Sequence, residues 1–208
     1  TYLASHSIVA LLKDGKRVAV SSNSHKAINK LLSEIEQRTW DDGFSFSGAK
    51  KASRDDPETE FDGQFITSVQ SSSDVSSCHQ LVGATVFHFV QEGPNSYDYL
   101  FVDEAGQVAL GNLAAMAGCA KNIVLIGDQM QLAQPIQGVH PGETGLSALD
   151  YLLQRQATIA RDKGILLNVS YRMHPTICQL VSEAIYDGRL TSAPSTASRR
   201  LVLGTDTH

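Results

Sequence analysis

Two apolar runs that end on acidic residues constrain the fold of this chain more than any other feature of its sequence. "YLFVDE" (99–104) runs from apolar residues into Asp103 and Glu104, and "NIVLIGD" (122–128) ends on Asp128. The stretch between them, "VALGNLAAMAGCA", is small, apolar and helical in character. The order is therefore strand, helix, strand, at the spacing of a parallel crossover. Nearly continuous apolar runs suit strands that are covered on both faces. The chain is predicted to be α/β, with a parallel sheet flanked by helices.

The rest of the chain repeats this alternation. Helical spacing of apolar residues before Gly15 and over 25–37 brackets a short strand pattern at 17–22. Further patterns predict the following strands and helices: strands at 64–69, 81–90 and 165–171, a helix at 145–156, and a helix that Pro175 opens and that runs through Tyr186. Two segments have no such pattern. Residues 39–62 are predicted to be a polar surface excursion of unassigned structure, and 191–208 a frayed or truncated tail.

Composition narrows the classes of protein to which the chain can belong. Of its 208 residues, 42% are hydrophobic and 19% are charged, which is typical of a globular chain of one or two domains. No apolar run could cross a bilayer and no signal peptide is present, so we expect a cytoplasmic protein without a membrane partner. A formal net charge of −5 argues against coating nucleic acid by bulk electrostatics, but it leaves a narrow local track open.

The polar strand ends are the candidate site. In open α/β sheets, ligands collect at the carboxyl ends of parallel strands, where Asp103-Glu104, Asp128 and Tyr171-Arg172 are predicted to lie. Adjacent carboxylates at a strand end point in different directions, so Asp103 could address a hydrated magnesium ion while Glu104 reaches for a water. That division suits phosphoryl transfer. The alternative is that an Asp-Glu pair only marks a solvated strand end.

Three motifs in order carry a specific resemblance. "VDEAGQ", "GDQMQLAQP" and "YRMHP" resemble motifs II, III and IV of the superfamily 1 helicases, in the branch that moves 5′ to 3′ on single strands. "VAVSSNSHKAINKLL" is similar to motif Ia, and "VGATVFHF" to the segment with the next strand-contacting motif. The resemblance covers most of residues 1–190. It is nearest to bacterial proteins that fuse such a unit to a RecB-like nuclease, although this chain contains no nuclease motif.

The resemblance implies a RecA-like P-loop NTPase fold and a role for each motif residue. Asp103 would hold magnesium through water, and Glu104 would be the general base. Gln131 would contact the γ-phosphate, supported by Asp128. Arg172 would be an arginine finger from a second domain. The alternatives are that Gln131 is an ordinary loop amide and that Arg172 is a surface guanidinium or a buried ion-pair partner.

The same resemblance implies contacts to the backbone of a single strand. The residues concerned follow two predicted strands and are Ser22, Asn23, Ser24, His25, Lys26 and Thr85. Ser24 could equally cap the following helix. A small basic cluster, Lys50, Lys51 and Arg54, is interpreted as part of a solvated loop.

One expected part of the motif set is missing. Helicases of this type need a GxxxxGK[ST] phosphate loop, and the sequence contains none. The layout of 1–20 resembles the stretch that follows this loop, which implies that Thr1 is its last residue and a magnesium ligand. The alternative is that Thr1 is only the start of a helix. We expect this chain alone not to hydrolyse ATP.

These observations predict two domains and one activity. Residues 1–163 would be a first RecA-like motor domain that lacks most of its phosphate loop, and 164–208 the truncated beginning of a second. The expected activity is ATP- and magnesium-dependent movement on single-stranded nucleic acid, DNA rather than RNA, with a fused nuclease possible outside this chain. The alternatives are a nucleic-acid-dependent ATPase switch or remodeller that does not unwind, and a non-catalytic interaction relic.

Overall fold

The structure is a computed structural model that describes residues 1–131, 141–154 and 156–200. It divides into two compact units, Thr1–Leu152 and Leu153–His208, which are described separately below. The division falls ahead of the domain boundary predicted at residues 163 and 164, and that boundary stays a prediction of where the second motor domain begins.

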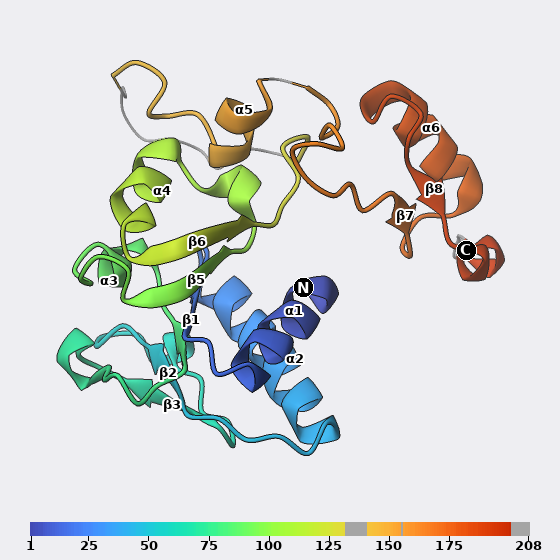
Figure 1. The fold of residues 1–208 in the computed structure, drawn as a ribbon. Coiled ribbons are helices and arrows are strands. Elements are labelled where there is room, and N and C mark those ends of the chain that lie inside the picture. The colour runs from blue at the N-terminus through green and yellow to red at the C-terminus, as the bar shows by residue number, and fades with distance from the viewer. Residues whose placement is uncertain (132–140, 155, 201–208) are drawn as a thin grey trace, which may run out of the picture. The chain divides into compact units, whose positions relative to one another are not determined.

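The first unit is built on a parallel sheet (Figure 1). Within the described residues it has six strands in the order β3-β2-β4-β1-β5-β6, and every neighbouring pair is parallel. The strands are β1 (Val18–Ser21), β2 (Gly48–Lys51), β3 (Ile66–Val69), β4 (Leu81–Gly83), β5 (Tyr97–Val102) and β6 (Ala120–Leu125). The helices are α1 (Tyr2–Lys13), α2 (His25–Asp41), α3 (Val86–Phe89), α4 (Leu110–Ala117) and α5 (Ala148–Leu153). The predicted α/β class is confirmed.

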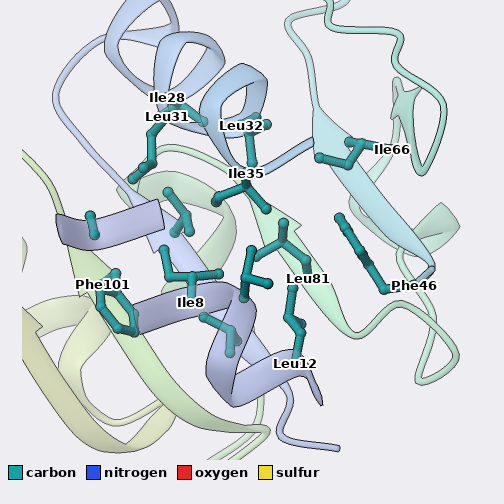
Figure 2. Packing of buried hydrophobic residues seen from close by; sticks show 14 residues of the cluster. Ile8, Leu12, Ile28, Leu31, Leu32, Ile35, Phe46, Ile66, Leu81 and Phe101 are labelled. Atoms are coloured by element: carbon teal, nitrogen blue, oxygen red, sulfur yellow. The ribbon is translucent and has the colours of Figure 1, made fainter. Parts of the chain in front are cut away.

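The core lies where α1 and α2 pack on the sheet. Their apolar residues recur every three to four positions, so each helix turns one face inward. Figure 2 shows Ile8 and Leu12 of α1 beside four residues of α2, all fully or almost fully buried: Ile28, Leu31, Leu32 and Ile35. Strand residues such as Leu81 and Phe101 complete this cluster. The predicted order of helix, strand, helix at the start of the chain is therefore confirmed.

The excursion at 39–62 is not a solvated loop. It contains β2, which lies inside the sheet between β3 and β4, and a short 3-10 helix, η1 (Pro57–Thr59). Glu36 of α2 holds the segment that leads from this region into β3, because its carboxylate accepts hydrogen bonds of 2.8 to 2.9 Å from the backbone amides of Gln64, Phe65 and Ile66. A strand inside the sheet therefore lies within 39–62, although the composition of this segment is polar.

Two predicted strands are shorter than expected. The prediction of a strand over 81–90 was wrong beyond Gly83, because Val86–Phe89 forms α3. This helix turns Phe89 inward, and its ring packs edge-on against Tyr97 at 5.6 Å between centroids. The strand predicted at 165–171 is β7, which spans only Val169–Ser170.

The second unit is small. Its strand β7 pairs in parallel with β8 (Thr191–Ser192). Helix α6 (Pro175–Ile185) lies between them in sequence and begins at Pro175, as predicted. The expected frayed tail contains β8 and a 3-10 helix, η4 (Pro194–Ser198), while residues 201–208 lie outside the described residues. No described helix is both long enough and apolar enough to cross a membrane.

Candidate functional site

The carboxyl ends of the parallel strands share one edge of the sheet in the first unit. The loop after β1 contains Ser22 to Lys26, and the loop after β4 contains Thr85. Asp103 and Glu104 follow β5, and Asp128 and Gln131 follow β6. Because β4, β1, β5 and β6 are consecutive neighbours in the sheet, these four loops lie in sequence along one edge. The fold therefore brings together the candidate residues of the first unit that follow strands.

The backbone changes conformation between the two adjacent carboxylate residues. The Asp103 amide still donates to the carbonyl of Ser21 across the sheet, at 2.9 Å, and the residue is only 8% exposed. Glu104 has a left-handed backbone, with φ 54° and ψ 41°, which is uncommon for a residue with a side chain. Its side chain is half-buried. The backbone of Asp103 is thus still bonded to the sheet, whereas that of Glu104 has left the extended conformation of the strand.

The loops after β5 and β6 interlock through their backbones. The amide of Ala105 donates to the carbonyl of Ile126 at 2.9 Å. A Cβ on Gly106 would overlap the carbonyl of Asp128, and a Cβ on Gly127 would lie 2.7 Å from the nitrogen of Ala105. Both positions therefore need glycine for close approach. This contact fixes Asp103-Glu104 relative to the loop that carries Asp128.

Asp128 organises its own loop. One carboxylate oxygen accepts from the Met130 amide at 3.0 Å, and the other from Nε2 of Gln131 at 3.3 Å. The Gln131 side chain is therefore positioned by Asp128, although the residue is exposed. The later part of this motif, 132–135, lies outside the described residues.

The loop after β1 contacts the loop after β5. The side-chain amide of Asn23 donates to the carbonyl of Gln107. Ser24 accepts from the Ala27 amide at 3.1 Å, so its predicted capping role is confirmed. The Ser22 hydroxyl is buried and makes no hydrogen bond within the described residues. Lys26 is exposed at the first turn of α2, which leaves its ammonium group accessible.

Thr85 and Thr1 each precede a helix without capping it. Thr85 precedes α3 and Thr1 precedes α1, and neither side chain makes a cap hydrogen bond. The chain turns from the end of α1 at Lys13 into β1 at Val18, so α1 runs antiparallel to the strands and Thr1 lies toward their carboxyl edge. Neither hydroxyl therefore caps its helix, and Thr1 lies toward the carboxyl edge of the sheet.

Arg172 belongs to the second unit. It follows β7 in the turn before α6, and its amide donates to Ser170 Oγ at 3.4 Å. The residue is exposed, and within the described residues its guanidinium forms no ion pair. The alternative of a buried ion-pair partner is therefore contradicted.

Comparisons with known proteins agree with this geometry. A family model described as "AAA domain" matches residues 147–207. The chain is 26% identical over 197 residues to the DNA replication ATP-dependent helicase/nuclease DNA2 of Xenopus laevis, covering 90% of this chain and 18% of that protein. It is 28% identical over 207 residues to the DNA replication ATP-dependent helicase/nuclease dna2 of Schizosaccharomyces pombe, covering 98% and 13%. These similarities support a superfamily 1 helicase motor fragment.

A solved helicase shares the fold. The complex of Arterivirus nonstructural protein 10 (helicase) with DNA superposes with a TM-score of 0.54 at 16% identity, covering 99% of this chain and 42% of that chain. The likeness supports a RecA-like fold. The chain spans less than a fifth of the two DNA2 relatives, so the activity of the whole protein is treated below as a proposal.

P-loop helicases use a nucleotide and usually magnesium, and the carboxylates of the site suit the ion. Among the described residues, no group of three or more His, Cys, Asp or Glu side chains could hold a metal ion by itself. Magnesium commonly keeps several waters and is held by one or two carboxylates together with substrate phosphates. Asp103, the first residue after β5, suits such a site. When bound, the ion would neutralise negative charge on the phosphates.

The prediction that Lys50 belongs to a solvated loop was wrong. Lys50 lies on β2 with 0% exposure, and its ammonium group is 2.8 Å from His25 Nδ1 at the start of α2. Burial, and to a lesser extent the charge of Lys51, lower its pKa to about 8. Sequence reasoning missed this pair because a lysine in a polar segment is usually solvated. The one available signal was the small, apolar Gly48-Ala49 just before it.

Proposed function

We propose that this chain supplies the water-activating and strand-contacting part of an ATP-dependent helicase that moves on single-stranded nucleic acid. The observation that carries the proposal is the interlocking of the loops after β5 and β6 through Gly106 and Gly127. That packing keeps Asp103 and Glu104 next to the loop in which Asp128 holds Gln131. Such an arrangement suits phosphoryl transfer, in which a positioned base and a γ-phosphate sensor act on the same nucleotide.

The proposed chemistry assigns separate tasks to the two carboxylates. Glu104, half-buried and with a left-handed backbone, would accept a proton from the attacking water. Asp103 would hold hydrated magnesium, and the Thr1 hydroxyl, which makes no cap hydrogen bond, would be a second ligand. Gln131 would hydrogen-bond to the γ-phosphate, and Arg172 of the second unit would stabilise charge on the transferring group. We propose residues 1–163 as the first motor domain.

The proposed path of the single-stranded nucleic acid follows the loops after β1 and β4. Its polar contacts would be those of Ser22, Asn23, Ser24, His25, Lys26 and Thr85. The amino-terminal end of α2 favours phosphate there, because unpaired amides and the helix dipole both attract anions. Phe87 lies two residues after Thr85 and is 78% exposed, so its ring is available to stack on a base.

Hydrolysis and strand binding would be coupled through Asn23. This residue belongs to the loop of the proposed strand path, and its hydrogen bond ends on Gln107, three residues after Glu104. A shift of either loop therefore has to break or move the same bond. DNA is the proposed substrate because relatives are named DNA replication helicases. The same names include a nuclease, which supports a fused nuclease domain outside this chain.

The test is Glu104→Gln in the complete gene product. Loss of a general base predicts a fall in nucleic-acid-stimulated ATP turnover of about 10²- to 10⁴-fold, with single-strand affinity retained. Glu34→Gln, an exposed change on α2, is the matched control and should leave turnover unchanged. Turnover within twofold of wild type for Glu104→Gln would refute the assignment, as would equal losses in both variants.

A further inference from the structure

Lys50 is a buried lysine whose ammonium group has three hydrogen-bonding neighbours. Its Nζ lies 2.9 Å from the carbonyl oxygen of Lys51 and 3.0 Å from that of Thr59. The third neighbour is Nδ1 of His25, at 2.8 Å. The side chain thus joins β2, the 3-10 helix η1 and the first residue of α2.

The number of protons decides which way the contact with His25 runs. An ammonium group has three donors and no acceptor. Two of its N–H groups go to the carbonyl oxygens, which can only accept, and the third is left for His25. Nδ1 of His25 must then be the unprotonated nitrogen of a neutral ring, so the ring proton sits on Nε2.

We propose that Lys50 is a positioning residue that holds His25 as the neutral Nε2–H tautomer and so presents this N–H to the phosphate backbone of a bound single strand. The contact between His25 and a nucleic-acid strand rests on the proposed function. The tautomer of His25 rests only on the contacts of Lys50. Lys50 lies inside the sheet, whereas the other residues proposed to contact the nucleic acid lie in or next to loops.

The surroundings of His25 support a neutral ring. Its pKa is lowered chiefly by burial and then by the charge of Lys50, while Asp56 acts in the opposite direction and Lys51 in the same one. Within the described residues no hydrogen bond ends on Nε2, and the His25 residue is partly exposed. The ring therefore has one nitrogen fixed by protein and one open to a ligand. A neutral donor of this kind would contact any phosphate regardless of sequence.

The tautomer can be read directly in the wild-type chain. Long-range proton–nitrogen NMR correlations of the ¹⁵N-labelled 208-residue chain near pH 7 should give His25 Nδ1 the shift of an unprotonated nitrogen and Nε2 that of a protonated one. Lys50→Met should remove this preference. Lys30→Met, which changes an exposed lysine on the same helix as His25, should keep it. A wild-type ring protonated on Nδ1 overturns the proposal without recourse to any variant.

Strand binding separates a positioning role from a merely structural one. Fluorescence anisotropy with a labelled oligothymidylate should give about fivefold weaker binding for His25→Phe and for Lys50→Met, the cost of one hydrogen bond. The double variant should lose no more than either single variant, because both changes remove the same contact. Losses that multiply would overturn the positioning role. An Nε2–H ring in a chain that shows no saturable binding would refute the proposed function and the strand contact, and would leave the tautomer standing.

Discussion

Replacing Lys50 by methionine should change how the stability of the first unit depends on pH. Methionine keeps most of the length and apolar stem of lysine but cannot be protonated. In the folded chain the pKa of Lys50 is lowered from 10.5 to about 8, mainly by burial. Between these two values the unfolded lysine binds a proton and the folded one does not. Raising the pH through this window therefore favours the folded state of the wild type.

The size of the effect follows from the two pKa values. Proton linkage gives a rise in the free energy of unfolding of about 2 kcal/mol between about pH 7 and about pH 9.5. Other groups also titrate there. Burial raises the pKa of Cys119 to about 11, which lowers stability as the pH rises. Such contributions are common to both proteins, so the difference between wild type and Lys50→Met isolates Lys50.

The assay is urea unfolding followed by the fluorescence of Trp40, the one tryptophan of the chain. Trp40 lies on α2, the helix that begins at His25, so it reports on the unit that contains Lys50. Lys30→Met, which removes an exposed charge from the same helix, should follow the wild-type pH dependence. Equal pH slopes for wild type and Lys50→Met would refute the argument that this lysine is desolvated.

Three further predictions test the site itself. Gly106→Ala should destabilise the first unit by roughly 1–3 kcal/mol in the same urea assay, because its Cβ meets the Asp128 carbonyl; Gly118→Ala, with open space around its Cβ, should not. Phe87→Ala should weaken oligothymidylate binding by about 1–3 kcal/mol if the ring stacks on a base, whereas the equally apolar change Trp40→Ala, at 60% exposure, should leave affinity unchanged. The 208-residue chain should show no nucleic-acid-stimulated ATPase in a phosphate-release assay, since its sequence has no GxxxxGK[ST] loop; measurable turnover would contradict the assignment of the phosphate loop.

The parts of the fold that could be predicted are those set by local patterns. Helix α2 followed from Ile28, Leu31, Leu32 and Ile35 at helical spacing, and the crossover from β5 to β6 followed from two apolar runs with a helix between them. The carboxyl-edge placement of Asp103 then followed from the general geometry of parallel sheets. These inferences need no knowledge of distant contacts.

The parts that could not be predicted depend on contacts between distant segments. Lys50 is buried because Thr59 and His25, 9 and 25 residues away, supply acceptors for its ammonium group. No local pattern encodes such a set. The interlocking of Gly106 and Gly127 could likewise not be predicted, because glycine occurs in loops for many reasons. Only the pairing of β5 with β6 brings these two residues together.

The most direct test of the central claim is to map where a single strand touches the chain. Amide NMR spectra of the ¹⁵N-labelled chain should be recorded while unlabelled oligothymidylate is added. Saturable, salt-sensitive shifts should concentrate at residues 22–26 and 85–87, with smaller ones at 103–107 carried through the Asn23–Gln107 hydrogen bond. The absence of saturable shifts, or shifts centred on the far end of α2 around Trp40, would contradict the assignment of the carboxyl edge as a strand-binding motor site.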